Sequence, residues 1–377
     1  MSINASHLVV QRTIGEQPII IETGKLALQA HGSVIVRRGD TVVLATAVMA
    51  DKARADIDFL PLTVEFEERL YSAGKIPGSF FRREGRPAAE AILSCRLTDR
   101  SIRPLFPKGL HNDVQIILTV LSADPEHPPE ILGMIGASAA LTISKIPFEG
   151  PVGSCRVAYL DGQYVVHPTY DQIQRSQLNM VISSNEEAII MVEAGSNEVS
   201  EQIILEGIKQ ARLANNETIN LIKEMEVTAG QAKVEVPVDF EEAQALESQI
   251  KSLVIDDLQD VLSLNSFKAE RDEGLDRLEE QALEKLSDDY SEQKIAEGFK
   301  NVLKGEVRSR ILNLGIRPDG RSKEEIRPIS CEVGTLPRTH GSGLFTRGQT
   351  QVLSVATVGS LTMKQTLDTV GPDTTKR

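Results

Sequence analysis

The amino-acid sequence predicts an α+β protein in which two copies of one β-rich domain flank an all-helical segment. Three observations lead to this prediction: strand-like alternation over the first sixty residues, uninterrupted helical patterning over residues 239–310, and an internal repeat that begins again after residue 316. The chain has 377 residues, of which 41% are hydrophobic, enough for two or three domains. We expect a first domain at 1–230, a helical linker domain at 231–315 and a truncated second copy at 316–377.

Within the first domain, short apolar or alternating runs separated by turns that contain glycine predict an antiparallel meander. A run without Gly or Pro between Pro87 and Pro104 predicts a helix over residues 88–103. The expected strands of the meander are 18–22, 26–30, 33–36 and 41–48. The later elements are a strand at 114–122, helices at 130–144 and 199–226, a hairpin at 155–166 that turns on Asp161 and Gly162, and strands at 179–183 and 188–192.

The helical linker domain is acidic. Residues 239–310 carry 19 acidic and 10 basic side chains, a balance of −9 in a chain whose formal charge is −13. Because an acidic face repels RNA, this segment is expected to be a solvated spacer and not a gripping surface.

The internal repeat aligns residues 31–48 with residues 340–357. Nine of these 18 positions are identical without a gap, and the shared residues lie mainly at the turn and at the strand starts. His31 and His340 occupy the same place in both copies, so we expect them to serve the shared fold. The first copy occupies about 230 residues and the second only about 60. An unfinished sheet would expose an apolar face, so we expect the chain to be a fragment or a shortened product.

Residues 80–107 form a basic segment in this acidic protein. Phe80 and Phe81 stand beside an arginine pair in a chain with 4% aromatic residues, which is typical of an exposed loop that stacks on bases. The alternative is a buried aromatic pair. On the following helix, arginines spaced i, i+4, i+7 share one face and can follow a phosphate ladder; the alternative for Arg100 and Arg103 is a structural ion pair. The candidate residues for base stacking and phosphate contact, to which the family resemblance described below assigns RNA binding, are Phe80, Phe81, Arg82, Arg83, Arg86, Arg96, Arg100 and Arg103.

Composition excludes several other classes of protein. The chain has no apolar run of 18 residues, and its N-terminus does not resemble a signal peptide. Its three cysteines lie far apart and form no metal-binding pair, which suits a reducing cytoplasm. We therefore expect a cytoplasmic protein without a membrane partner.

Several long motifs resemble bacterial polynucleotide phosphorylase: FFRREGRP, RLTDRSIRPLFP, MIGASAAL at residues 134–141, IRPDGR at 316–321 and LPRTHGSGLFTRGQTQ at 336–351. This resemblance covers the whole chain. It implies two cores like those of RNase PH (ribosomal protein S5 domain 2-like), an all-helical domain between them, and KH and S1 domains beyond. It also implies a homotrimer that binds single-stranded RNA, works with RNA-degradation partners, and uses Mg²⁺ and inorganic phosphate to release nucleoside diphosphates.

The resemblance further implies that the active site belongs to the second core. The family's phosphate-binding serine loop, metal-binding Asp pair and catalytic Lys would fall after Arg377, so we assign no catalytic and no metal-binding residue here. In the first copy, an acidic, proline-rich run at 124–130 replaces the serines, and Asn179 and Val181 replace the Asp and the Lys. Two hypotheses follow: a phosphorolytic 3′-to-5′ exoribonuclease whose catalytic half is missing from this chain, or a non-catalytic RNA-binding or assembly module. A stand-alone enzyme that uses the first copy is disfavoured by Asn179 and Val181.

Overall fold

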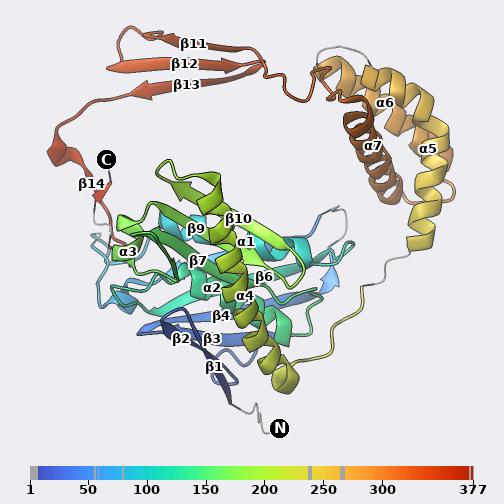
Figure 1. Ribbon diagram of the computed structural model, residues 1–377. Coiled ribbons are helices and arrows are strands. Elements are labelled where there is room, and N and C mark those ends of the chain that lie inside the picture. The colour runs from blue at the N-terminus through green and yellow to red at the C-terminus, as the bar shows by residue number, and fades with distance from the viewer. Residues whose placement is uncertain are drawn as a thin grey trace. The chain divides into compact units, whose positions relative to one another are not determined.

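The computed structural model describes residues 7–54, 57, 59–78, 80–236, 240–263, 268–372 and 375–376. The chain forms two compact units, residues 1–237 with 365–377, and residues 238–364 (Figure 1). These units do not follow the expected domains, because the second copy of the repeat shares a unit with the helices and its last residues join the first unit. The boundaries at 230 and 315 therefore stay a prediction.

The first unit contains a six-stranded sheet in the order β1-β2-β3-β4-β6-β5. Its first four strands form the expected antiparallel meander, and β4 pairs antiparallel with β6. Strand β5, which the sequence did not predict, pairs parallel with β6 at the sheet edge. The bounds are β1 Leu8–Ile14, β2 Gln17–Thr23, β3 Gly32–Arg38, β4 Thr41–Ala53, β5 Leu62–Glu68 and β6 Asn112–Ser122.

The strand predicted at residues 26–30 is wrong, because this stretch turns the chain between β2 and β3. Ala27 has a positive φ of 52°, and the Ala30 N–H donates to the Ala27 carbonyl over 3.0 Å. Ser33 Oγ donates to the Leu26 carbonyl over 2.6 Å and holds the turn against β3. Since the alternating residues Leu26 and Leu28 remain 40% and 50% exposed, the periodicity did not report a buried face.

The first unit also contains a four-stranded antiparallel sheet in the order β10-β9-β7-β8. The predicted hairpin is confirmed: β7 and β8 meet at Asp161 and Gly162, which both have positive φ. The two later strands are also confirmed. The bounds are β7 Gly153–Leu160, β8 Gln163–Val166, β9 Leu178–Ser184 and β10 Ile189–Ser196.

Helix α2 lies at the centre of the first unit, and it is buried along almost its whole length. Small residues let it approach the six-stranded sheet: a Cβ built on Gly136 would lie 2.8 Å from Ala45 Cβ, and one on Gly133 2.9 Å from the Phe66 ring. The predicted helices are confirmed within a few residues, and one short helix is added. The bounds are α1 Ala89–Ile102, α2 Glu130–Ile143, α3 Tyr170–Arg175 and α4 Glu201–Ala229, with single 3₁₀ turns η1 Leu70–Ala73 and η2 Arg103–Leu105.

The second unit contains three helices packed around a core of aliphatic side chains and Phe299. They confirm the helical patterning, of which residue 239 and residues 264–267 lie outside the described residues. No helix in the described part of the chain is long and apolar enough to cross a membrane. The helices are α5 Phe240–Ser263, α6 Lys268–Leu286 and α7 Glu292–Leu314, and the strands of its antiparallel sheet are β11 Ile329–Val333, β12 Gly341–Arg347 and β13 Thr350–Ala356, followed by the turn η3 Leu361–Met363.

Candidate nucleic-acid interface

The loop between η1 and α1 presents the two phenylalanines of the basic segment to solvent. Phe80 is 94% exposed and Phe81 78% exposed, so the buried-pair alternative does not hold in this structure. The two rings pack edge to face, with centroids 5.5 Å apart and planes at 84°. Their neighbour Arg82 has a positive φ of 50° and donates to the Pro77 carbonyl over 3.3 Å. A non-glycine residue in this region is uncommon, which fits a loop with one defined turn.

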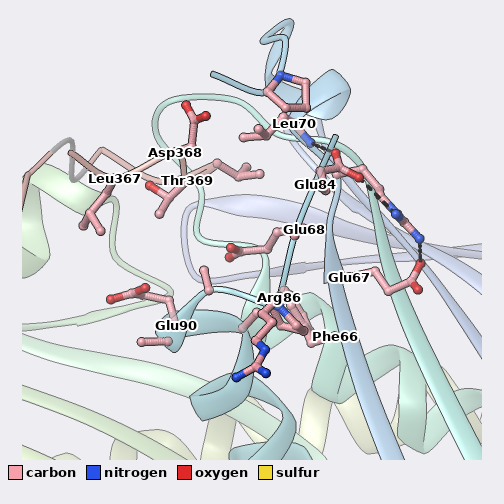
Figure 2. A pocket seen from close by; sticks show the side chains of 18 of the residues that line it. Phe66, Glu67, Glu68, Leu70, Glu84, Arg86, Glu90, Leu367, Asp368 and Thr369 are labelled. Atoms are coloured by element: carbon pink, nitrogen blue, oxygen red, sulfur yellow. Dashed lines mark hydrogen bonds and ion pairs between the residues drawn. The ribbon is translucent and has the colours of Figure 1, made fainter. Parts of the chain in front are cut away.

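Glu84 ties the later part of this loop to the residues that directly follow β5 (Figure 2). Its carboxylate accepts the Leu70 N–H over 2.8 Å and pairs with Arg69 over 3.0 Å. The hydrogen bond from Arg69 and that from the Leu70 backbone hold the pKa of Glu84 below its ordinary value. Arg69 also pairs with Glu67 over 2.9 Å. The loop therefore has an ordered base beneath its exposed tip.

Residues 365–370 lie against the earlier part of the same loop, at Lys75 and Gly78. No motif in the sequence predicted this contact. The Asp368 carboxylate accepts the Gly78 N–H, and Lys75 Nζ donates to the Thr369 carbonyl over 3.0 Å. Thr369 is 7% exposed. A cavity of about 510 Å³ separates this segment from β5 and the start of α1, and Glu68 and Glu90 point into the same region (Figure 2). Short strands at Gln365–Thr366 (β14) and Thr375–Lys376 (β15) pair beside it.

The three arginines spaced i, i+4, i+7 at α1 and η2 have different surroundings. Arg96 is exposed, and Arg96 and Arg100 line a second cavity of about 550 Å³. Arg100 pairs with Glu193 and also donates to the Val192 carbonyl over 3.3 Å. Arg103 instead contacts both carboxylate oxygens of Asp99, at 2.6 and 2.8 Å.

Arg103 has further partners at the start of β5. Its guanidinium donates to the carbonyls of Leu60 and Leu62 over 3.0 and 3.2 Å. With these two carbonyls and the Asp99 carboxylate, most of its donors are used within the first unit. The geometry therefore favours the structural ion pair for Arg103, because phosphate contact would require these bonds to break.

Carboxylates balance the arginines in the second cavity. Glu68, Glu90 and Glu130 line it, and one oxygen of Glu68 is buried without a hydrogen-bond partner. Desolvation, and then repulsion from Glu90 and Glu130, raises the pKa of Glu68 to about 7. The basic segment is thus open at its loop and locally compensated along α1.

Asn179 and Val181, which align with the family's catalytic Asp and Lys, have structural roles in the first unit. Asn179 Oδ1 accepts from Arg156 over 2.7 Å, and Val181 is 3% exposed. Arg156 also pairs with Glu130 over 2.8 Å. An amide already bonded to a guanidinium and a buried valine offer neither a cation nor a good magnesium ligand.

Within the run at 124–130, backbone N–H groups hold the carboxylate of Asp124. The Asp124 carboxylate accepts the backbone N–H groups of Asp40, Glu126 and His127 over 2.7–3.0 Å. Burial alone would raise the pKa of Asp124, but these bonds and one from the His127 ring lower it. Among the described residues, no three His, Cys, Asp or Glu side chains are grouped as metal ligands.

Models of known protein families match residues in both units. The model "3′ exoribonuclease family, domain 1" matches residues 15–147 and 325–373, and "3′ exoribonuclease family, domain 2" matches residues 150–214. The model "Polyribonucleotide nucleotidyltransferase, RNA binding domain" matches residues 245–322. The chain is therefore built from 3′ exoribonuclease-type domains, with the predicted α+β core of the RNase PH type, a helical region and the start of a second core.

Two individual relatives with the same name identify a narrower family within this class. The chain is 44% identical over 380 residues to polyribonucleotide nucleotidyltransferase of Natranaerobius thermophilus, covering 98% of this chain and 53% of that protein. It is 46% identical over 371 residues to the protein of the same name from Heliobacterium modesticaldum, covering 98% and 52%. The crystal structure of rice Rrp46 aligns with a TM-score of 0.45 at 15% identity, covering 56% of this chain and 95% of that one.

The chain belongs to the polyribonucleotide nucleotidyltransferase family, which confirms the resemblance drawn from its motifs. It spans about half the length of the curated relatives it matches.

Proposed function

We propose that this chain is the RNA-gripping part of a phosphorolytic 3′-to-5′ exoribonuclease, a polyribonucleotide nucleotidyltransferase that releases nucleoside diphosphates. The observation that carries the proposal is the exposed pair Phe80 and Phe81 beside Arg82. Two large rings almost fully in water have no role in the core, whereas a base stacked on such a ring gains about 1–3 kcal/mol. Stacking tolerates every base, which suits an enzyme that degrades RNA regardless of sequence.

The proposed contacts divide between loop and helix. Phe80 and Phe81 stack on bases, while the arginines of the loop and the first two of α1 meet phosphates. For Arg100, contact with RNA requires exchange of its partner Glu193, and both side chains are about half exposed. Because exposed ion pairs contribute only about 0–1 kcal/mol, a phosphate can replace the carboxylate. The proposed phosphate-binding arginines are Arg82, Arg83, Arg86, Arg96 and Arg100.

We also propose that the first copy does not cleave RNA. Phosphorolysis brings a phosphate oxygen to a phosphodiester phosphorus and expels the 3′ oxygen, so charge must be neutralised at the reacting atoms. Asn179 and Val181, which stand where the family's active core has its Asp and Lys, carry no charge that could do this. Mg²⁺ and inorganic phosphate belong to this proposal as requirements of the family's reaction, and no step of it is assigned to the described residues.

The proposed partners are single-stranded RNA, further copies of the chain in a homotrimer and RNA-degradation proteins, in the cytoplasm. A second candidate function is a non-catalytic RNA-binding or assembly module. The internal bonding of Asn179 favours it for this chain taken alone.

Salt dependence of RNA binding tests the gripping role. Five arginine–phosphate contacts predict a slope of log K against log [salt] of about −3.5 for a single strand, at about −0.7 per contact. Arg82→Ala combined with Arg83→Ala should flatten the slope by about 1 to 1.5. The matched control, Arg37→Ala with Arg175→Ala, removes two exposed arginines outside the segment and should leave the slope unchanged. A wild-type slope near zero would contradict the proposal.

Catalysis is tested separately with poly(A) and inorganic phosphate. We expect the chain to bind poly(A) without releasing nucleoside diphosphate. Release that depends on phosphate would overturn the assignment of the first copy as silent and would exclude the module hypothesis. Binding without release supports the module for this chain and leaves the gripping role in place.

A further inference from the structure

A small cavity lies in the first unit, away from the RNA-gripping loop, and both apolar and polar side chains line it. It has a volume of about 10 Å³ and lies between β3, the run at 124–130, β7 and the segment after β8. Four of the residues that line it carry a ring or guanidinium nitrogen that is buried without a hydrogen-bond partner. These atoms are Arg38 Nε, His127 Nε2, Arg156 Nε and His167 Nε2.

The burial of these side chains makes four unpartnered nitrogens costly. Arg38 is 7% exposed, and His127 and His167 are each 5% exposed. A buried polar group left without a partner is destabilising, so native proteins rarely retain several of them in one place. A ligand that satisfied all four at once would remove most of this cost.

Asp124 holds one of the two ring nitrogens of His127. Nδ1 lies 2.8 and 3.0 Å from the two oxygens of Asp124, so it donates to this carboxylate. In the neutral ring Nε2 then bears a lone pair and accepts. His167 stays neutral, because desolvation, and then the charges of Arg38 and Arg156, lower its pKa to about 3.

The guanidinium nitrogens are the opposite kind of group. Arg38 Nε and Arg156 Nε each carry one N–H and can only donate. The terminal nitrogens of Arg156 are already bonded to Asn179 and Glu130. The cavity thus offers two donors and two imidazole Nε2 atoms, each of which accepts in the neutral ring.

We propose that this cavity is the binding site of one structural water molecule that bridges Arg38, Arg156, His127 and His167. Water has two lone pairs and two O–H groups, which match two N–H donors and two imidazole acceptors. A cavity needs about 10–15 Å³ to hold one water, and buried waters commonly make two to four hydrogen bonds. A halide fits less well, since it would face the lone pair of His127 Nε2, and phosphate is too large.

The proposed water links segments that are distant in sequence. It ties the run at 124–130 to β3 and β7, beside the bond from Thr41 Oγ1 to the His127 carbonyl at 3.0 Å. Space at this junction is tight: a Cβ built on Gly39 would lie 2.9 Å from the His127 ring. The water thereby completes a rigid mount for the run that stands where the resemblance expects a phosphate-binding loop in an active core.

Magnetic relaxation dispersion of water ¹⁷O in solutions of the full chain tests the proposal, because it counts long-lived internal waters. His167→Phe replaces an acceptor with a ring that fills the cavity, and should lower the count by one. His111→Phe, a histidine outside the cavity, is the matched control and should leave the count as in the wild type. An unchanged count in folded His167→Phe protein would overturn the proposal.

A crystal of the wild-type protein soaked in bromide gives a second test that needs no variant. We expect electron density for one water within hydrogen-bond distance of the four nitrogens, with no anomalous signal from bromide there. An anomalous peak in the cavity would overturn the water assignment in favour of an anion site. Absence of any density at the four nitrogens would overturn the site itself.

Discussion

The two copies of the repeat form the same hairpin in very different surroundings. In the first copy Gly32 pairs with Ala47, and in the second Gly341 pairs with Ala356, with matching registers throughout. The histidines that open the copies also act alike: His31 Nδ1 accepts the Met49 N–H, and His340 Nδ1 accepts an N–H 18 residues further on, each over 3.0 Å. This confirms their structural role.

Burial separates the two hairpins. Val36 and Val43 are fully buried in the first copy, whereas Phe345 and Val352, which occupy the same places in the second, are 41% and 55% exposed. Helix α2 covers the first hairpin, and the described strands of the second remain open to solvent. The comparison shows that local sequence specifies strand pairing and register, while distant parts of the chain supply the core.

A charge placed at the shared core position should give the largest difference between the copies. Val43→Asp buries a carboxylate without a partner and should destabilise the first unit by about 4 kcal/mol or more. Val352→Asp, at an exposed site, should change stability by less than about 0.5 kcal/mol. Urea unfolding followed by tyrosine near-ultraviolet circular dichroism measures the first unit, which holds four of the five tyrosines, and hydrogen exchange of the β12 and β13 amides measures the second hairpin. Equal costs would show that the second hairpin is buried.

A methyl group on the shared glycine should have the next largest effect. A Cβ on Gly32 would lie 2.0 Å from the Ala140 carbonyl oxygen in α2, so Gly32→Ala must displace helix or strand and should cost about 3 kcal/mol. A Cβ on Gly341 meets only Ala356 Cβ at 3.5 Å, an ordinary contact. Gly341→Ala should therefore be neutral within about 0.5 kcal/mol. The same unfolding measurement tests the first variant, and hydrogen exchange of the β12 and β13 amides tests the second.

Removal of the shared histidines should have a moderate effect. His31→Ala leaves the Met49 N–H without its acceptor in a half-buried site, at a cost of about 1–2 kcal/mol. His340→Ala should cost less than about 0.5 kcal/mol, because water reaches the exposed Val358 N–H. Amide exchange at Met49 and at Val358 reports each bond directly. Faster exchange at Val358 with no change at Met49 would reverse the expected order.

The smallest expected effect is a pH dependence in the first copy. Desolvation, and then the charge of Lys145, lower the pKa of His31 below 6.5. The unfolded chain therefore binds the proton more readily, so His31 contributes stability that is present above pH 6.5 and is lost as the pH falls below it. The cost of His31→Asn should thus be smaller at pH 5.5 than at pH 7.5, as measured by urea unfolding. A larger cost at the lower pH would contradict the sign of this shift.

Much of the fold could be predicted because it depends on local signals. Proline and glycine positions marked the ends of α1 and the turn between β7 and β8, and uninterrupted helical patterning marked α5 to α7. The strand predicted at residues 26–30 failed because an alternating pattern also occurs in an exposed turn. Strand β5 was missed because its glutamates weaken the apolar signal, while its parallel pairing with β6 depends on a partner about fifty residues away.

The candidate site was predictable in composition and not in contacts. The exposure of Phe80 and Phe81 follows from their glycine and arginine neighbours, which oppose burial. By contrast, the Asp99 partner of Arg103 competes at the same i, i+4 spacing that predicted a phosphate-binding face. The contact of Asp368 with the Gly78 N–H joins residues 290 positions apart, and no spacing rule reaches that far.

The loop that carries Phe80 and Phe81 is anchored in a way that would let another loop sequence replace it. Its entry is fixed by buried Leu70 and its exit by buried Ala91, and Glu84 ties the two sides together. Residues between these anchors contribute little to the core, so their length and chemistry can change at little cost to folding. In evolution, or in a design that grafts other loops here, this makes the exposed aromatic loop a replaceable part whose sequence can diverge while the scaffold is retained.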